Sequence, residues 1–144
     1  AADYAFGAQM AKDLDGIVTS KGGKIAGVVR HPTGASDYSS FLLQAQASKA
    51  QVIALANAGF DTINAIKQAN EFGIAAAGQK IAALVVFISD VHSLGLAQTQ
   101  GLTALTAFYH DRDDASRAWS KRFFERTGRM PGMIQAGTYS AVLH

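Results

Sequence analysis

The chain has 144 residues, of which 49% are hydrophobic and 17% charged, and its formal net charge is +2. This length is sufficient for one domain with a hydrophobic core. The small net charge gives no argument for a nucleic-acid or membrane partner. Because the chain contains no cysteine, disulfides, thiolate metal sites and cysteine nucleophiles are excluded. No apolar run reaches the length of about 18 residues that a membrane-spanning helix requires.

A helix is predicted near the start of the chain by apolar residues at helical spacing, namely Phe6, Met10, Leu14, Ile17 and Val18. The glycines at 22 and 23 are expected to end it. The short β-branched run over 24–30 then predicts a buried strand. Ser36 is the expected N-cap of the next helix, with Asp37 in its first turn.

Further strands are predicted over 51–56, 81–88 and 102–109, and a helix from Asp61 to Phe72 lies between the first two. Strands that alternate with helices at intervals of roughly 20 to 30 residues are typical of βαβ units and a parallel sheet. From Asp113 the pattern is helical only, and Pro131-Gly132 separates two helices. We therefore predict an α/β fold, a three-layer lobe with a mostly parallel sheet flanked by helices, as one ligand-binding lobe over 1–144.

The residues that carry metal or catalytic chemistry form no recognisable motif. The four histidines lack ligand spacing, and there is no phosphate-binding glycine motif, so we expect neither a metal nor a cofactor. Ser89, Asp90 and His92 are the residue types of a catalytic triad, but closeness in sequence does not give a triad's geometry. An acid–base pair of Asp90 with His92 or His110 is the alternative that remains open. We predict that the protein is not an enzyme.

A ligand site is predicted instead from where residues stand relative to the ends of the predicted strands. In open parallel sheets, ligands bind in the crevice beyond the carboxyl ends of the strands. Aromatic rings, a carboxylate, an amide and helix-start backbone amides gather at these ends, and they suit a small polar molecule with an apolar body. The candidate residues are Tyr4, Phe6, Asn57, Ala58, Gly59, Phe60, Asp90 and Tyr109.

Most of these candidates also have a structural interpretation. Tyr4 and Phe6 could pack at a helix start, Asp90 could be an N-cap, and Asn57 could occupy a left-handed turn. Tyr109 could belong to the core. The prediction depends on the group as a whole.

The order and spacing of several motifs carry a family resemblance. They are Asp3-Tyr4-Ala5-Phe6-Gly7, Gly34-Ala35-Ser36-Asp37-Tyr38, Ala54-Leu55-Ala56-Asn57-Ala58-Gly59, Ile66-Lys67-Gln68-Ala69-Asn70-Glu71-Phe72-Gly73, Gln100-Gly101-Leu102 and the run from Met130-Pro131 to Tyr139-Ser140-Ala141. Over essentially its whole length the chain resembles the type I periplasmic substrate-binding proteins of ABC transporters, in the branched-chain amino acid-binding (Leu/Ile/Val) group. The segment 89–95 looks like the subgroup that takes up aromatic acids.

The resemblance implies a two-lobed receptor that closes over its ligand, of which this chain would be most of the second lobe, truncated at both ends. It implies that Tyr4 faces the cleft, that the loop from Asn57 to Phe60 contributes to the site, and that Asp90 meets a ligand's amino group. Phe60 departs from the family pattern, because a small residue is commoner there. A ring at this position would narrow the pocket or stack on an aromatic ligand.

The function implied by the resemblance is that of the periplasmic solute-binding component of an ABC importer, which binds an aromatic acid or a branched-chain amino acid and delivers it to a membrane permease. A ligand-sensing domain of a receptor or transcription regulator is the alternative with the same fold. We also expect the fragment to associate with itself, because a truncated lobe would expose apolar surface.

Overall fold

The chain forms two compact units in a computed structural model that describes residues 1–143. The first unit comprises residues 1–86 and 90–105, and the second comprises 87–89 and 106 onward. The prediction of a single lobe over the whole chain remains a prediction.

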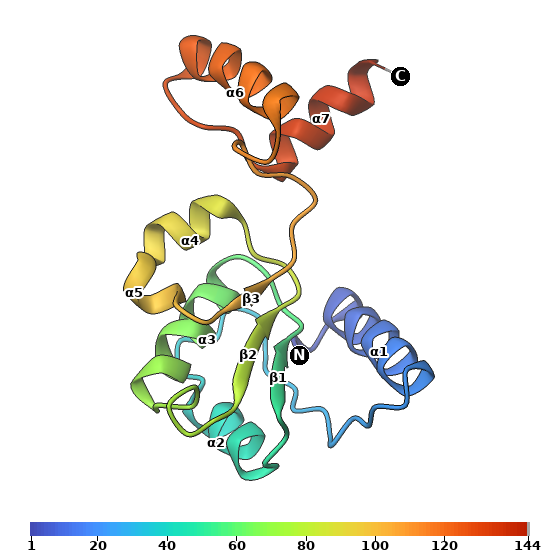
Figure 1. Ribbon diagram of the computed structural model, residues 1–144. Helices are drawn as coiled ribbons and strands as arrows, with labels where there is room; N and C mark the ends of the chain where they lie inside the picture. The colour runs from blue at the N-terminus through green and yellow to red at the C-terminus, as the bar shows by residue number, and fades with distance from the viewer. Residues whose placement is uncertain (144) are drawn as a thin grey trace. The chain divides into compact units, whose positions relative to one another are not determined.

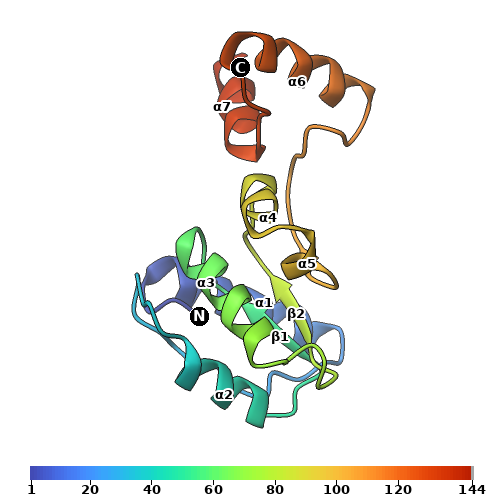
Figure 2. The ribbon, with the colours of Figure 1, turned by 90° about the vertical axis from the view of Figure 1, so that its left-hand side faces the viewer.

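The first unit is built on a parallel sheet in the order β1-β2-β3. Its strands are β1 (Val52–Leu55), β2 (Lys80–Ala83) and β3 (Thr103–Ala104). Its helices are α1 (Ala5–Ser20), α2 (Ser39–Ala47), α3 (Phe60–Glu71) and α5 (Leu96–Thr99), while α4 (Ile88–Leu94) begins in residues assigned to the second unit. In Figures 1 and 2, α1 lies on one side of the sheet, and α2, α3 and α5 lie on the other. The predicted α/β class and three-layer arrangement are confirmed.

The strand predicted over 24–30 is wrong, because none of these residues belongs to a strand. A strand needs a neighbour along its length. Here the pairing is confined to one end, where His31 N donates to Ala1 O (3.0 Å), Asp3 N donates to His31 O (2.8 Å) and a single parallel bridge joins Ala2 to His31. Residues 24–30 therefore have the β-branched composition of a strand but do not pair with a neighbouring strand.

The strands predicted over 81–88 and 102–109 form only in their first residues. β1 ends at Leu55, whose carbonyl oxygen accepts a bond from Leu84 N (3.2 Å), and β2 ends at Ala83, so residues 84–88 are not part of the sheet. The chain instead enters α4 at Ile88. β3 pairs only with Ala82 and Ala83, for the same reason.

The core of the first unit lies between the sheet and the α2–α3 pair. Its buried members are Tyr38, Leu42, Ile53, Leu55, Ala65, Ile66, Ala69, Ile74, Ile81 and Leu94. By contrast, α1 has a single buried residue, Gly7. The apolar stripe that predicted α1 thus remains largely accessible to solvent, with Ile17 62% exposed.

The second unit contains α6 (Asp114–Thr127) and α7 (Met133–Leu143), which matches the helical pattern predicted after Asp113. Asp113 is the N-cap of α6, where Oδ1 accepts from Ser116 N at 2.7 Å. Gly128 ends the helix in the left-handed conformation with φ 68°. Trp119 packs its ring against those of Phe108, Phe123 and Tyr139, with centroids 5.3 to 5.5 Å apart. Within residues 1–143, no helix is long and apolar enough to cross a membrane.

Candidate ligand-binding site

The carboxyl ends of the strands in the first unit bring the N-terminal residues next to the end of β1. Ala2 N donates to Ala56 O at 2.9 Å, directly after β1, and Gly7 of α1 packs on Ala2. Tyr4 and Asn57 therefore lie close together, because they come just after Ala2 and Ala56, whose backbones are hydrogen-bonded to each other. The rings of Tyr4 and Phe6 lie 5.9 Å apart and are 45% and 42% exposed, so both are accessible to a ligand at this edge.

Asn57 is only 2% exposed, and its side chain is satisfied within the protein. Its Nδ2 lies 3.1 Å from His31 Nε2, and its Oδ1 accepts from Thr62 Oγ1 at 2.8 Å. His31 Nδ1 lies 2.9 Å from Pro32 O, a bond that only a protonated Nδ1 can donate, which leaves Nε2 to accept from the amide. The side chain of Asn57 thus fixes the loop that carries the site, while its backbone remains a candidate for ligand contact.

A second buried pair, Tyr38 and Asp61, ties the loop 34–38 to the start of α3. Tyr38 Oη donates to Asp61 Oδ1 at 2.8 Å, and Gly34 N donates to the same oxygen at 3.0 Å. Burial, reinforced by the bond to the Asp61 carboxylate, raises the pKa of the Tyr38 hydroxyl above its ordinary value. The hydroxyl therefore stays protonated and holds the loop in place.

Gln68 completes this attachment and corrects the predicted cap of α2. Its Oε1 accepts from Tyr38 N (2.7 Å), and its Nε2 donates to Ser36 O (2.9 Å). Ser36 does not cap α2, because the helix begins at Ser39 and the carboxylate of Asp37 accepts from Ser39 N at 2.8 Å.

The start of α3 is an open part of this edge. Gly59 adopts φ 61° and ψ −134°, a conformation that favours glycine, and no side chain caps the helix there. Asp61 does not cap the helix either, since its carboxylate binds Tyr38. The Phe60 ring is 83% exposed at this position, beside the half-buried Ala58 and Gly59. Uncapped N–H groups at a helix start can bind a carboxylate, and an exposed ring can stack on an apolar ligand body.

Asp90 and Tyr109 lie on segments other than those just described. Asp90 is half-buried in the first turn of α4, which follows β2, so it lies beyond the carboxyl end of the neighbouring strand. Tyr109 belongs to the second unit, outside any strand, and is 39% exposed. The bond between Ala2 and Ala56 brings Tyr4, Phe6 and the segment from Asn57 to Phe60 to one edge of the first unit. Asp90 follows the neighbouring strand in the same unit, and Tyr109 belongs to the second unit.

The alternative acid–base pair has little support in this geometry. Asp90 and His92 are two positions apart in α4, and residues at that spacing do not face each other on a helix. His110 lies in the other unit. Among residues 1–143, no group of three or more histidine and carboxylate side chains is placed to hold a metal ion.

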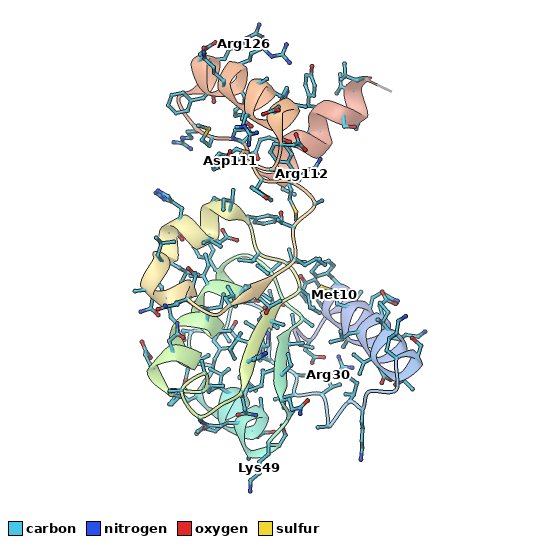
Figure 3. All side chains as sticks on the ribbon, viewed as in Figure 1. Met10, Arg30, Lys49, Asp111, Arg112 and Arg126 are labelled. Atoms are coloured by element: carbon cyan, nitrogen blue, oxygen red, sulfur yellow. The ribbon has the colours of Figure 1, made fainter. Side chains whose placement is uncertain are left out.

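Sequence reasoning did not identify the polar side chains that support this edge, namely the buried His31, Tyr38, Asp61 and Thr62 and the half-buried Gln68. Their partners are 5 to 32 residues away in the sequence, and no local motif marks the pairing. For Thr62 a signal was available, since its spacing places it on the same face of α3 as Ile66 and Ala69. Arg30, labelled in Figure 3, forms an exposed ion pair with Asp3 at 3.8 Å.

An α/β lobe with helices on both sides of a parallel sheet and an accessible, aromatic-rich edge is an architecture in which small-molecule sites are common. The family described as "Periplasmic binding protein" matches residues 1–144. The chain belongs to this family, as its motifs predicted, and the family is one of binding proteins rather than enzymes. No curated protein matches the chain.

Solved structures of this family resemble the chain closely. A periplasmic binding protein from Burkholderia mallei is 57% identical, with a TM-score of 0.90 over 98% of this chain and 37% of that one. A branched-chain amino acid ABC transporter periplasmic ligand-binding protein from Burkholderia xenovorans LB400 is 44% identical, with a TM-score of 0.88 over 99% of this chain and 38% of that one. The chain therefore spans little more than a third of the length of these relatives.

A solute-binding protein of an ABC transporter from R. palustris, solved in complex with 4-hydroxybenzoate, is 25% identical, with a TM-score of 0.61. This match covers 67% of the present chain and 27% of that protein.

Proposed function

We propose that this chain is the ligand-binding lobe of a periplasmic solute-binding protein that serves an ABC importer. The observation that carries the proposal is the start of α3, where the exposed Phe60 ring stands beside uncapped backbone N–H groups. An anionic group would bind the N–H groups, and the apolar body of the ligand would lie on the ring. No covalent chemistry is required of any residue at this edge.

We propose a small carboxylate as the ligand, either a branched-chain amino acid or an aromatic acid. The first choice is supported by the 44% identical Burkholderia xenovorans protein, which is described as a branched-chain amino acid-binding component. The second is supported by the exposed rings of Tyr4, Phe6 and Phe60 and by the R. palustris protein in complex with 4-hydroxybenzoate. Asp90 would meet an amino group if the ligand carries one. In the intact protein the ligand would be delivered to the importer's permease.

Isothermal titration of the intact protein with leucine and with 4-hydroxybenzoate tests this proposal. We expect Phe60→Ala to weaken binding by about tenfold or more. The ligand would bury the Phe60 ring, and losing the burial of such a ring costs about 1.5–3 kcal/mol. The matched control is Phe72→Ala at the opposite end of α3, which should leave the affinity unchanged. Equal affinities for the two variants, or no binding of either ligand class, would contradict the proposal.

We further propose that the isolated chain associates with a second copy of itself through the accessible side of α1. The apolar residues Ile17 and Val28 and the β1 residue Val52 are 62%, 49% and 49% exposed in the same unit. Exposed apolar side chains favour association.

A further inference from the structure

His31 is a buried histidine beside the loop that leads from β1 to α3, and the protein holds both its backbone and its ring. The residue is only 4% exposed. Its backbone forms the bridge to Ala2, next to the end of β1, where Figure 1 shows the N-terminus. Its ring packs against those of Tyr38 and Phe41, with centroids 4.9 and 6.0 Å away. The ring is therefore fixed relative to the end of β1.

A chain of hydrogen bonds with a defined direction runs from α3 to this ring. Thr62 Oγ1 donates to Asn57 Oδ1 (2.8 Å), and Asn57 Nδ2 lies 3.1 Å from His31 Nε2. Because His31 Nδ1 carries the proton that Pro32 O accepts at 2.9 Å, Nε2 can accept from the amide only while the ring is neutral. Thr62 and Asn57 are 0% and 2% exposed, so bulk water does not replace a partner that is lost there.

A second proton on the His31 ring would disrupt this chain. It turns Nε2 into a donor that faces the NH2 group of Asn57, and two donors do not bond to each other. If the amide turns so that Oδ1 faces the ring, the hydroxyl of Thr62 loses the acceptor that it has now. In either case a buried polar group loses a hydrogen bond. Asn57 would then be held less firmly, and it begins the loop that leads to the uncapped N–H groups of α3.

The charged and titratable groups on the surrounding elements are engaged elsewhere. These groups are the Ala1 ammonium, Asp3, Arg30, Tyr38 and Asp61. The ammonium donates to a backbone oxygen, and Asp3 pairs with Arg30. The Asp61 carboxylate accepts from Tyr38 Oη. No ion pair to His31 occurs within residues 1–143, so a charge on its ring would have no partner there.

We propose that neutral His31 positions the ligand loop, residues 57–60, through Asn57, and that a second proton on its ring weakens ligand binding. The inference rests on the proposed function, because it assigns a pH-dependent control to the same edge. The ring fixes the Asn57 amide, the amide fixes the loop, and the loop presents Gly59 and Phe60 to the ligand. The ring gains its second proton as the pH falls, so binding is strongest at neutral pH and weakens in acid.

The first test needs no ligand. It follows the 15N-labelled imidazole of His31 and the side-chain amide of Asn57 in the full chain by NMR from pH 7.5 to pH 5, which brackets the ordinary range of histidine titration. We expect one ring N–H at pH 7.5, on Nδ1, and Asn57 amide signals that shift together with the ring. A ring N–H on Nε2 at pH 7.5, a ring that stays neutral throughout, or amide signals that do not follow it would overturn the inference.

The second test repeats the titration of the intact protein with leucine and with 4-hydroxybenzoate at pH 7.5 and pH 5. We expect the affinity to fall about two- to tenfold in acid, the usual worth of one hydrogen bond. His31→Gln, which accepts from Asn57 but does not titrate, should lose this dependence. Other ionisable groups of the protein and the ligand are common to parent and variant. Replacing His92, an exposed histidine of α4, by Gln is the matched control and should retain the dependence.

Asn57→Asp provides a check with the opposite sign. Its carboxylate only accepts, so the doubly protonated ring becomes the better partner, and the second ring N–H should already be present at pH 7.5. A parent affinity that does not fall in acid, or that falls equally in His31→Gln, would overturn the inference. Absence of binding at pH 7.5 would contradict the proposed function instead, and the NMR titration then decides the role of His31 independently.

Discussion

Gly7 is the residue at which α1 meets the N-terminal residues. A Cβ at this position would lie 2.2 Å from Ala2 O, a backbone atom that is held in place by the hydrogen bonds of Ala1–Asp3. The contact requires a residue without a side chain, which gives a physical reason for the glycine of the Asp3–Gly7 motif.

We expect Gly7→Ala to destabilise the fold by about 1–3 kcal/mol, the usual cost of forcing an atom into a packed site. Gly16→Ala, in the same helix, should instead stabilise it by about 0.5–1 kcal/mol, because a Cβ at position 16 meets nothing within 4 Å. Urea denaturation of both variants measures the difference. Equal midpoints for Gly7→Ala and the parent chain would refute the close contact.

Tyr38 leads to a prediction at alkaline pH. Its pKa in the folded chain is raised above the ordinary 10.0 by burial and by the bond to Asp61. Above that ordinary value the unfolded chain loses the proton while the folded chain retains it, so stability is full below pH 10 and falls as the pH rises further.

Tyr38→Phe should remove this part of the alkaline loss and should also destabilise the chain at neutral pH, because Asp61 loses a hydrogen bond. Urea midpoints between pH 8 and 11 provide the measurement. The other tyrosines are present in both the parent chain and Tyr38→Phe, so their effect on the pH profile is the same in both. Parallel pH profiles for the two chains would contradict the role given to Tyr38.

At the scale of elements, Asp113 stabilises the start of α6 in two ways, through a hydrogen bond and through its negative charge. The Asp113 carboxylate accepts from Ser116 N and pairs with Arg112, which is labelled in Figure 3. The backbone bond from Ser116, then its side chain and Arg112, lower the pKa of Asp113 from 3.8 to about 2. The stability that this group supplies is therefore present above pH 3.8 and is lost as the pH falls toward 2.

Two substitutions of Asp113 should distinguish these contributions. Asp113→Asn retains a good N-cap, so we expect nearly parental stability at pH 7 and a weaker loss between pH 4 and 2. Asp113→Ala loses the cap at every pH. Circular dichroism during thermal unfolding at pH 7 and pH 2.5 reports both effects. Identical behaviour of the two variants would show that Asp113 does not cap α6.

At the scale of the whole molecule, we expect the isolated chain to associate at high concentration through the accessible side of α1. Replacing Ile17 and Val28 together by lysine should shift the chain toward monomer, because charges on this surface oppose burial. Leu96→Lys, at an 84% exposed position of α5, is the control and should leave association unchanged. Size-exclusion chromatography with light scattering measures the mass. A monomeric parent chain at high concentration would refute this expectation.

The helices were the part of the fold that the sequence predicted best. The apolar spacing of α1, and the apolar spacing and Asp113 cap of α6, are features of neighbouring residues, so each helix is specified locally. Strands depend on a neighbour instead. The run over 24–30 has strand composition but forms no ladder, and β2 ends at Ala83 because β1 ends at Leu55.

The sequence by itself determined the α/β class and the family, because periodicity and motif order are properties of the chain. It predicted the edge of the sheet where a ligand should bind, and that remains a prediction. Only the tertiary structure decided which side chains are available there. Asn57 and Asp61 looked like a turn residue and a helix start, yet their side chains bind His31 and Tyr38 across 26 and 23 residues. Such pairs form only when packing brings distant segments together and excludes water, so a buried polar group must find a partner that no local pattern reveals.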